Sequence, residues 1–291
     1  MFNGIIPAAP LEVRPCGLFS VARLVEHREE DEHWLNGADI ETRAYPTVQI
    51  RTNQDAVIAG GEGVVFDGSD KEDTYKTTPF FVELSASKTS VKYVLENGIT
   101  PELEKQTKAI AQKAVEFELW EGVATKNATP ESEAGYLRRP TAEGGAEVVT
   151  SGGASPEKAL WLLEQAIAES PTGAPGIIHM TADVASALGS RIRYFEKNEI
   201  DQNTFAVTRI GTLVVIGSGY TGAGPEGAGG AAASATNKWM FATGAVTAET
   251  GRIFIQEYAQ PSTNDHTALV SLPAAVHFDP SIFSAAQVTL S

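Results

Sequence analysis

The longest amphipathic segment of the chain, TPELEKQTKAIAQKAVEFELWEG, constrains the fold most strongly. Thr100 followed by Pro101 is a typical helix start, and Gly122 is a typical stop. Small and apolar side chains recur at helical spacing: Leu103, Thr107, Ile110, Ala114 and Phe117 on one face, with Ala111, Val115 and Leu119 beside them. The pattern predicts one helix over about residues 100–121, roughly 32 Å long. Its apolar stripe is narrow, so other elements must cover it.

The segment before this helix, residues 46–85, has a β pattern. TVQIRT and FFVELSAS alternate in polarity, and AVIAGGEGVVF breaks at a Gly-Gly pair before the polar crossing FDGSDKEDTYKTTP. Such runs, separated by glycine-rich turns, predict long hairpin ribbons. They contain too few apolar residues to build a core, so we expect an extension that leans on another surface.

The rest of the chain mixes helices and strands. Residues 124–154 are polar and glycine-rich, and a second helix is expected from the cap Ser155 and Pro156 to the residue before Pro171. Further strands and one short helix are expected in GIIHM, TADVASAL, FAVTRIGTLVVIGSGY, KWMFATGAV, RIFIQEY and TALVSLPAAVHF, the last of which closes the chain. There is no regular strand–helix alternation, which favours an α+β fold over a doubly wound sheet.

Charge and cysteine content exclude several classes of protein. The 22 basic and 37 acidic residues give a formal charge of −15, and the longest basic cluster is Arg138-Arg139. Sequence-specific DNA binding is therefore not expected. Cys16 is the only cysteine, so the sequence predicts no internal disulfide, no thiolate metal cluster and a reducing compartment. No secretory signal or membrane-spanning run is predicted.

The stretch GSGYTGAGPEGAGGAAASATN, residues 217–237, has the glycine content of a phosphate-binding loop. It lacks the Gly-Lys-Ser/Thr of a phosphate loop, and no predicted helix follows it to provide a positive dipole end. We expect a mobile connection with little to bury.

No catalytic, cofactor-binding or metal-binding residue is predicted. His27 and His33 bracket an acidic run at a spacing that matches no standard ligand pattern, and His179 is expected to be a packed histidine. No Gly-x-Ser-x-Gly motif occurs, Cys16 lies in an apolar context, and Asn264, Asp265 and His266 are expected to form a turn.

Five local stretches, in order along the chain, resemble major capsid proteins of tailed bacteriophages, in particular those of actinobacteria. They are GLFSVA (17–22), HWLNG (33–37), FFVELSAS (80–87), AVEFELWEG (114–122) and NDHTALV (264–270). The resemblance implies the Hong Kong 97-type α+β fold. It implies an N-terminal arm at 1–45, an E-loop at 46–85, a peripheral domain at 86–165 and 241–291 with a spine helix at about 100–121, and an axial domain at 166–240.

The same resemblance implies a structural protein without catalytic activity. It would self-assemble into the hexamers and pentamers of an icosahedral head that encloses double-stranded DNA, would be made in the host cytoplasm and would reside in the virion, with scaffold, portal and decoration proteins as partners and no membrane. Candidate packing and assembly residues are Trp34, Phe80, Phe81, Leu103, Ile110, Phe117, Leu119 and Trp120. Some relatives crosslink an E-loop lysine. Lys71 and Lys76 lie in that segment, but nothing in the sequence indicates that either is nucleophilic.

Two alternatives stay open at this point. One keeps the fold and changes the contents, as an encapsulin-like bacterial nanocompartment shell. The other is an unrecognised intracellular enzyme with a site around Asn264–His266.

Overall fold

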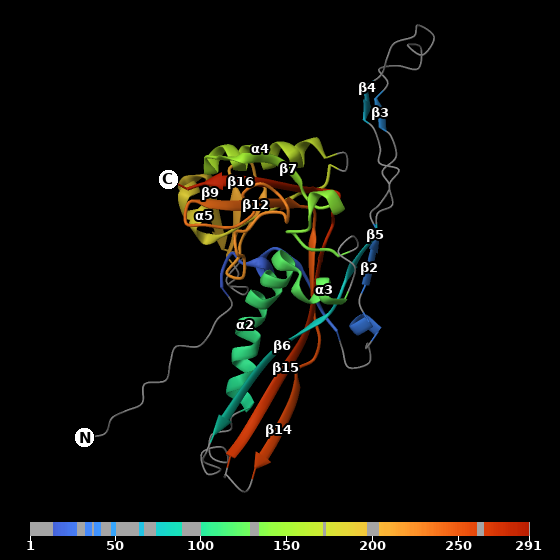
Figure 1. Ribbon diagram of the computed structural model, residues 1–291, viewed down its shortest axis with the longest axis vertical. Coiled ribbons are helices and arrows are strands. Elements are labelled where there is room, and N and C mark those ends of the chain that lie inside the picture. The colour runs from blue at the N-terminus through green and yellow to red at the C-terminus, as the bar shows by residue number, and fades with distance from the viewer. Residues whose placement is uncertain are drawn as a thin grey trace, which may run out of the picture.

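The computed structural model describes residues 14–27, 33–36, 38–41, 48–50, 64–66, 74–88, 100–128, 134–170, 173–196, 204–260 and 265–290. Within them the chain forms two mixed β-sheets and two isolated strand pairs, with a long helix beside the smaller of the two sheets (Figure 1). Strands and helices are mixed without a repeating β–α order, so the predicted α+β class is confirmed.

The larger sheet has seven strands in the order β7-β16-β12-β8-β11-β10-β9. Their bounds are β7 Glu147–Ala154, β8 Ile177–Met180, β9 Ile192–Glu196, β10 Thr204–Thr208, β11 Leu213–Ile216, β12 Asn237–Thr243 and β16 Phe283–Thr289. Helices α4 (Pro156–Glu169) and α5 (Ala182–Leu188) pack against this sheet. The start of α4 follows the sequence prediction, because the Ser155 hydroxyl accepts a hydrogen bond from the Lys158 N–H and Pro156 occupies the first turn.

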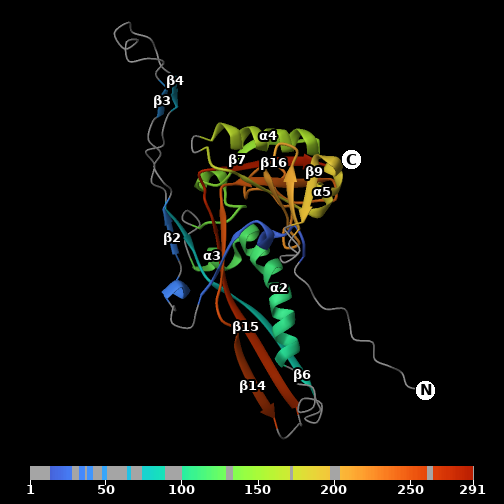
Figure 2. The ribbon, with the colours of Figure 1, turned by 180° about the vertical axis from the view of Figure 1, so that it is seen from behind.

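The smaller sheet has five strands, with β15 at its centre. Its members are β1 Arg23–Glu26, β6 Phe80–Lys88, β13 Val246–Thr250, β14 Phe254–Gln260 and β15 Asp265–Phe278. The 14-residue β15 pairs with β6 along one edge, and with β13 and then β14 along the other. Helix α2 (Thr100–Glu121) runs alongside β6 and β15, as seen from both sides in Figures 1 and 2.

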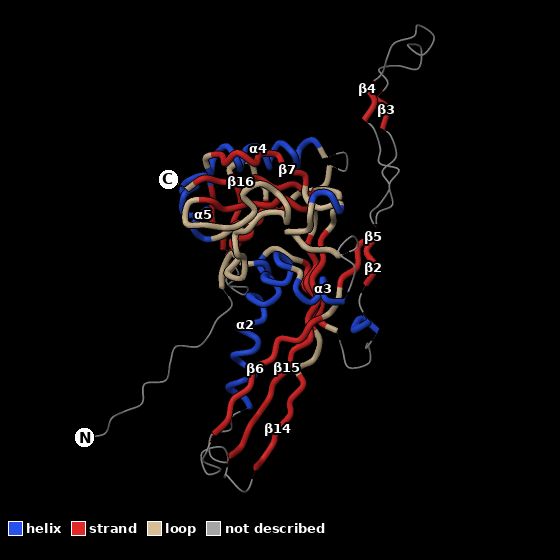
Figure 3. Tube along the Cα trace, in the orientation of Figure 1, coloured by secondary structure: helices blue, strands red, loops and turns tan. Residues whose placement is uncertain are grey.

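Two short antiparallel pairs form a ribbon. Strand β2 (Ala38–Glu41) pairs with β5 (Thr74–Thr77), and β3 (Val48–Ile50) pairs with β4 (Val64–Phe66). In Figures 1 and 3 the β3–β4 pair lies away from both large sheets. The predicted hairpin pairing is confirmed for β3 and β4. Neither β2, which lies before residue 46, nor β5, which lies in the predicted polar crossing, was predicted as a strand, and the predicted ribbon strand FFVELSAS pairs with β15 in the smaller sheet instead.

Two apolar cores lie on opposite faces of the seven-stranded sheet. Alternate residues of β12 separate them: Met240 and Ala242 pack with α4 and α5, whereas Trp239 and Phe241 face α2 and the smaller sheet. The second core joins residues from α2, β13 and β15 to the larger sheet. The two sheets are therefore parts of one packed body.

Several elements were not anticipated, among them β1, β2, β9, α3 (Val123–Ala128), β7 and β16. Residues 124–154, a polar and glycine-rich segment in which no helix or strand was predicted, contain most of the short helix α3 and the edge strand β7. Strand β16 follows the segment that was expected to close the chain, and it lies inside the larger sheet. Its sequence FSAAQVT is small and polar, and Ser284 and Gln287 are buried, so its hydrophobic pattern is weak.

Candidate functional site

The C-terminal half of α2 is where the separate parts of the chain meet. Glu116 is fully buried there, and its carboxylate accepts four hydrogen bonds. The Leu18 N–H donates to Oε1 at 2.9 Å, and Oε2 accepts from the Ser218 N–H at 2.6 Å, the Ser218 hydroxyl at 3.1 Å and the Gly219 N–H at 2.9 Å. One side chain thus ties α2 to the N-terminal segment and to the loop after β11.

Two further glutamates of α2 organise adjacent turns. Glu118 accepts hydrogen bonds from the Ala124 and Thr125 N–H groups at 3.0 and 2.9 Å and so caps the start of α3. Glu121 pairs with Arg138 and accepts a hydrogen bond from the Thr221 hydroxyl. The roles of these glutamates were not predicted. The motif EFELWE, residues 116–121, places three acidic residues in the part of the helix that other segments cover.

Trp120 completes this junction. Its ring packs 4.6 Å from that of Tyr220 and edge-on to Phe241 at 4.9 Å, and its Nε1–H donates to the Ala223 carbonyl at 3.0 Å. An indole with a satisfied N–H is typical of a packed core. Trp120 therefore fixes the glycine-rich segment against both α2 and the larger sheet.

The first half of the glycine-rich segment is not the mobile connection that its composition suggested. Most of residues 217–225 are buried against α2 and β12. A Cβ at Gly219 would lie 2.1 Å from the Lys113 carbonyl oxygen, and one at Gly224 would lie 2.3 Å from the Trp239 ring. Glycine is required at these positions because backbone approaches helix and indole too closely for a side chain.

His179 is a packed histidine, as predicted. It is fully buried, with Nδ1 2.8 Å from the Tyr220 hydroxyl and Nε2 2.8 Å from the Thr243 hydroxyl. The Thr243 hydroxyl donates its hydrogen to the Gly244 carbonyl, so it accepts from the histidine, and His179 carries its proton on Nε2. Burial lowers the pKa of His179 to about 3, which keeps the ring neutral.

The buried face of α2 differs from the expected one. Leu103, Leu119 and Trp120 are buried, but Ile110 and Phe117 are each 42% exposed. The N-terminal segment around Leu18 and the loop at Ser218 cover one side of the C-terminal half, which moves the buried arc away from Phe117. The exposed strip therefore follows from contacts distant in sequence.

The remaining candidate residues lie around the smaller sheet. Phe80 is half-buried between two apolar clusters, and Phe81 is exposed. Trp34, in the turn η2 (His33–Asn36), stacks on His27 with ring centres 4.5 Å apart. None of these contacts tests a role in assembly, which stays a prediction.

Strand β14 is the most exposed regular element of the smaller sheet. Residues 254–259 are all exposed, and they include Phe254 at 48%, Ile255 at 44% and Tyr258 at 59%. The strand bonds to β15 on one edge only, and within the described residues no strand pairs with its outer edge. Exposed edge strands of this kind are sites at which another chain can pair or pack.

Several predicted chemical groups are not brought together into a site. Lys71, Asn264 and the acidic residues 29–32 lie outside the described residues, and Lys76 is exposed on β5. Asp265 and His266, predicted to form a turn, are the first residues of β15. In the described part of the chain no cluster of three or more histidine, cysteine or acidic side chains could hold a metal ion. None of the described helices is long and apolar enough to cross a membrane.

The architecture is similar to that of several solved structures. No protein-family model and no curated protein sequence matches the chain. Its structure is similar to the capsid of an empty GTA particle, with a TM-score of 0.57 at 11% identity, covering 99% of this chain and 95% of that chain. It is also similar to a structure of Mycobacterium phage Cain, with a TM-score of 0.54 at 11% identity and coverage of 98% and 92%.

A third solved structure has a different origin. The SrpI encapsulin complex of Synechococcus elongatus matches with a TM-score of 0.52 at 11% identity, covering 97% of this chain and 91% of that chain. All three similarities extend over nearly the whole chain, ribbon, long helix and both sheets included. The chain therefore has the Hong Kong 97-type fold, as the sequence predicted.

Proposed function

We propose that this protein is the major capsid protein of a tailed-phage head, a structural subunit that assembles with copies of itself into hexamers and pentamers of a closed icosahedral shell. The observation that carries the proposal is an architecture left incomplete within one chain. A ribbon of two strand pairs belongs to neither sheet, and a strand with exposed Phe254, Ile255 and Tyr258 has an outer edge with which no described strand pairs. Structures with the same fold include capsids.

The energetic argument concerns β14. Burying one fully exposed large apolar side chain contributes about 1.5–3 kcal/mol. Because these three side chains are about half exposed, covering all of them provides about 2–4 kcal/mol for association. A neighbouring subunit is the partner that is always present at high local concentration in a shell. We assign the ribbon of one subunit to the β14 side of the next, because main-chain pairing and apolar burial are both available there.

We assign domains by sheet. The axial domain corresponds to the seven-stranded sheet with α4 and α5, and the peripheral domain to α2 with the five-stranded sheet. The limits expected at residues 166 and 241 fall inside α4 and β12, so we move them to the start of β7 and the end of β12, with β16 included in the axial domain. The E-loop corresponds to the ribbon from β2 to β5, and the N-terminal arm precedes it.

The contents, partners and location follow from the same proposal. Double-stranded DNA is enclosed without sequence-specific binding, because a chain with a net charge of −15 does not grip phosphate. Scaffold, portal and decoration proteins, assembly in the host cytoplasm and a final location in the virion belong to this function. The role is structural and not catalytic.

Removal of the ribbon tests the proposal. Residues 42–73 are replaced by a two-residue turn between β2 and β5, whose ends pair as Glu41 and Thr74. We expect a subunit with unchanged helix content and unfolding midpoint that no longer forms particles. A control replaces Phe66 alone with alanine and is expected to weaken assembly without abolishing it. Particles of native size from the ribbon-deleted chain would contradict the assignment.

The encapsulin similarity supports a second candidate, a nanocompartment shell that encloses an enzyme. The two functions predict different contents of particles purified from the native source. Nuclease-protected double-stranded DNA identifies the phage head, and a stoichiometric protein cargo identifies the nanocompartment. Turnover by a dissociated subunit would instead support the third alternative, an enzyme.

A further inference from the structure

Two histidines and one glutamate lie together on one face of the smaller sheet. In the strand register Val25 pairs with Glu249 and Thr247 pairs with His277, which brings residues of β1, β13 and β15 to the same face. His27 Nε2 lies 2.7 Å from Glu249 Oε2, and His277 Nδ1 lies 3.7 Å from Glu249 Oε1. A single carboxylate is thus placed between two imidazoles.

The same cluster holds the N-terminal segment on the sheet. The His27 N–H donates to the Thr250 carbonyl at 2.9 Å, which extends the parallel pairing of β1 with β13. Trp34 of η2 stacks on the His27 ring at an interplanar angle of 9°. A Cβ at Gly251 would lie 2.7 Å from the Trp34 ring, so glycine there lets the indole lie close to the sheet.

Burial and two neighbouring charges determine the pKa of His277, which lies below its ordinary value. Burial is the largest cause and lowers the pKa. The Glu249 carboxylate raises it, and the Arg23 guanidinium lowers it. His277 Nδ1 is buried and makes no hydrogen bond within the described residues. His27 also lines a hollow of about 640 Å³, together with the charged residues Glu26, Glu104, Lys108 and Arg252 and others.

One carboxylate can stabilise one imidazolium. A charge on His27 is matched by Glu249 at 2.7 Å and by the face of the Trp34 ring. A second charge on His277 would enter a partly buried site that already contains Arg23 and the His27–Glu249 pair. Among the described residues it has no unshared negative partner there, so protonation of His277 works against the closed arrangement.

We propose that the cluster of His27, Glu249 and His277 is a proton-sensitive attachment, closed at neutral pH with His277 uncharged and opened in mild acid, when β1 and η2 leave the sheet. The sign follows from linkage. With β1 and η2 off the sheet His277 takes up a proton near the ordinary histidine pKa, whereas with them attached it resists protonation, so its contribution to the attachment is complete above that pKa and weakens as the pH falls below it. A protonated His27 paired with Glu249 contributes with the opposite sign, so the proposal requires the His277 contribution to be the larger of the two.

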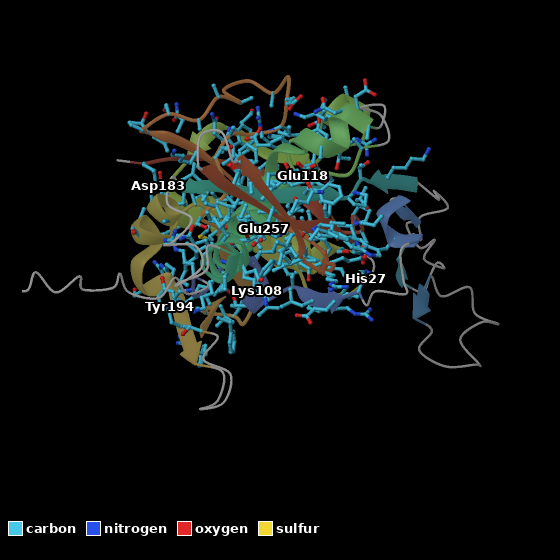
Figure 4. All side chains as sticks on the ribbon, turned by 90° about the horizontal axis from the view of Figure 1, so that it is seen from below. His27, Lys108, Glu118, Asp183, Tyr194 and Glu257 are labelled. Carbon is cyan, nitrogen blue, oxygen red and sulfur yellow. The ribbon has the colours of Figure 1, made fainter. Side chains whose placement is uncertain are left out.

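Release of β1 and η2 also affects the ribbon. Strand β2 begins at Ala38, two residues after η2 ends at Asn36. Release of β1 and η2 therefore frees the β2 end of the ribbon, while β5, which leads into β6, keeps the other end at the sheet. Figure 4 labels His27 on the opposite side of the view from Tyr194 of β9, which belongs to the larger sheet. The inference concerns contacts within one chain and does not rest on the proposed shell function.

Hydrogen exchange of the full-length protein, measured at about pH 7.5 and about pH 5 and corrected for intrinsic rates, tests the proposal. We expect amides of residues 23–27 to lose protection in acid while α4 keeps its own. His277→Gln is uncharged at both pH values, and we expect it to keep β1 protected in acid. Gly251→Ala displaces Trp34 without changing any charge, and we expect reduced protection at both pH values.

Equal protection of residues 23–27 at the two pH values in the native chain would overturn the proposal, as would an undiminished acid loss in His277→Gln. If that variant does not retain α4 protection, NMR titration of His277 in the native chain replaces it. A His277 midpoint below the ordinary histidine value supports the proposal, and a midpoint at or above that value overturns it.

Discussion

Replacement of Glu116 by glutamine tests the junction on which the packing of α2 depends. The substitution keeps the shape and removes the charge. The native carboxylate accepts one hydrogen bond at Oε1 from Leu18, and three at Oε2 from Ser218 and Gly219. An amide has only one oxygen, so it cannot serve both sets of donors.

The magnitude follows from these four bonds. Hydrogen bonds to a charged group contribute about 1.5–3 kcal/mol each, and neutral ones contribute about 1 kcal/mol. If the amide oxygen faces the loop, three bonds lose about 1 kcal/mol each, and the Leu18 N–H meets an amide donor at a cost of about 1–3 kcal/mol. Relief from burying a charge offsets part of this sum. We expect a net loss of about 2–4 kcal/mol in the free energy of unfolding.

Urea unfolding of the unassembled subunit measures this loss, with tryptophan fluorescence as the signal because Trp120 contacts Tyr220 in the affected loop. The matched control is Glu157→Gln, an exposed glutamate at the start of α4, for which we expect a change within about 0.5 kcal/mol. A Glu116→Gln variant as stable as the control would refute the account, because the buried carboxylate would then contribute nothing that an amide does not.

Three further predictions concern burial, pH and salt. Leu119→Asp places an unpaired charge in the core and is expected to prevent folding, whereas Phe117→Asp, two residues away at a site 42% exposed, is expected to leave the subunit folded, as circular dichroism will report. His179 has a pKa of about 3 when folded and about 6.5 when unfolded, so the unfolded state takes up a proton first. Below about pH 6.5 this group is expected to reduce the unfolding free energy by about 1.4 kcal/mol per pH unit, a slope that His179→Gln removes in urea titrations. Light scattering is expected to show more assembly as ionic strength rises from low to moderate values, because salt screens repulsion between acidic subunits; equal assembly in very low salt would contradict this.

Local signals in the sequence predicted the elements that local interactions define. Pro156 behind the cap Ser155 marks α4, and Gly189, with a φ of 50°, ends the helical turn of α5. The alternation of FFVELSAS marks β6. In each case the signal and the structure that it specifies lie within a few residues of each other.

Contacts between distant segments explain the failures. Periodicity located α2, but the side on which its C-terminal half is covered depends on Leu18 and Ser218, each about 100 residues away. Glycine composition suggested mobility between β11 and β12, yet Gly219 and Gly224 are glycine because α2 and Trp239 approach them. Strand β16 is held in the larger sheet by its neighbours β7 and β12, and its own pattern is too weak to predict it.

Electron microscopy of the purified full-length protein at high concentration tests the central claim most directly. The account predicts closed hollow particles built from hexamers and pentamers, in which the ribbon of each subunit contacts the β14 side of its neighbour. A compact monomer that stays monomeric under the same conditions, with β14 and the ribbon uncovered, would contradict it.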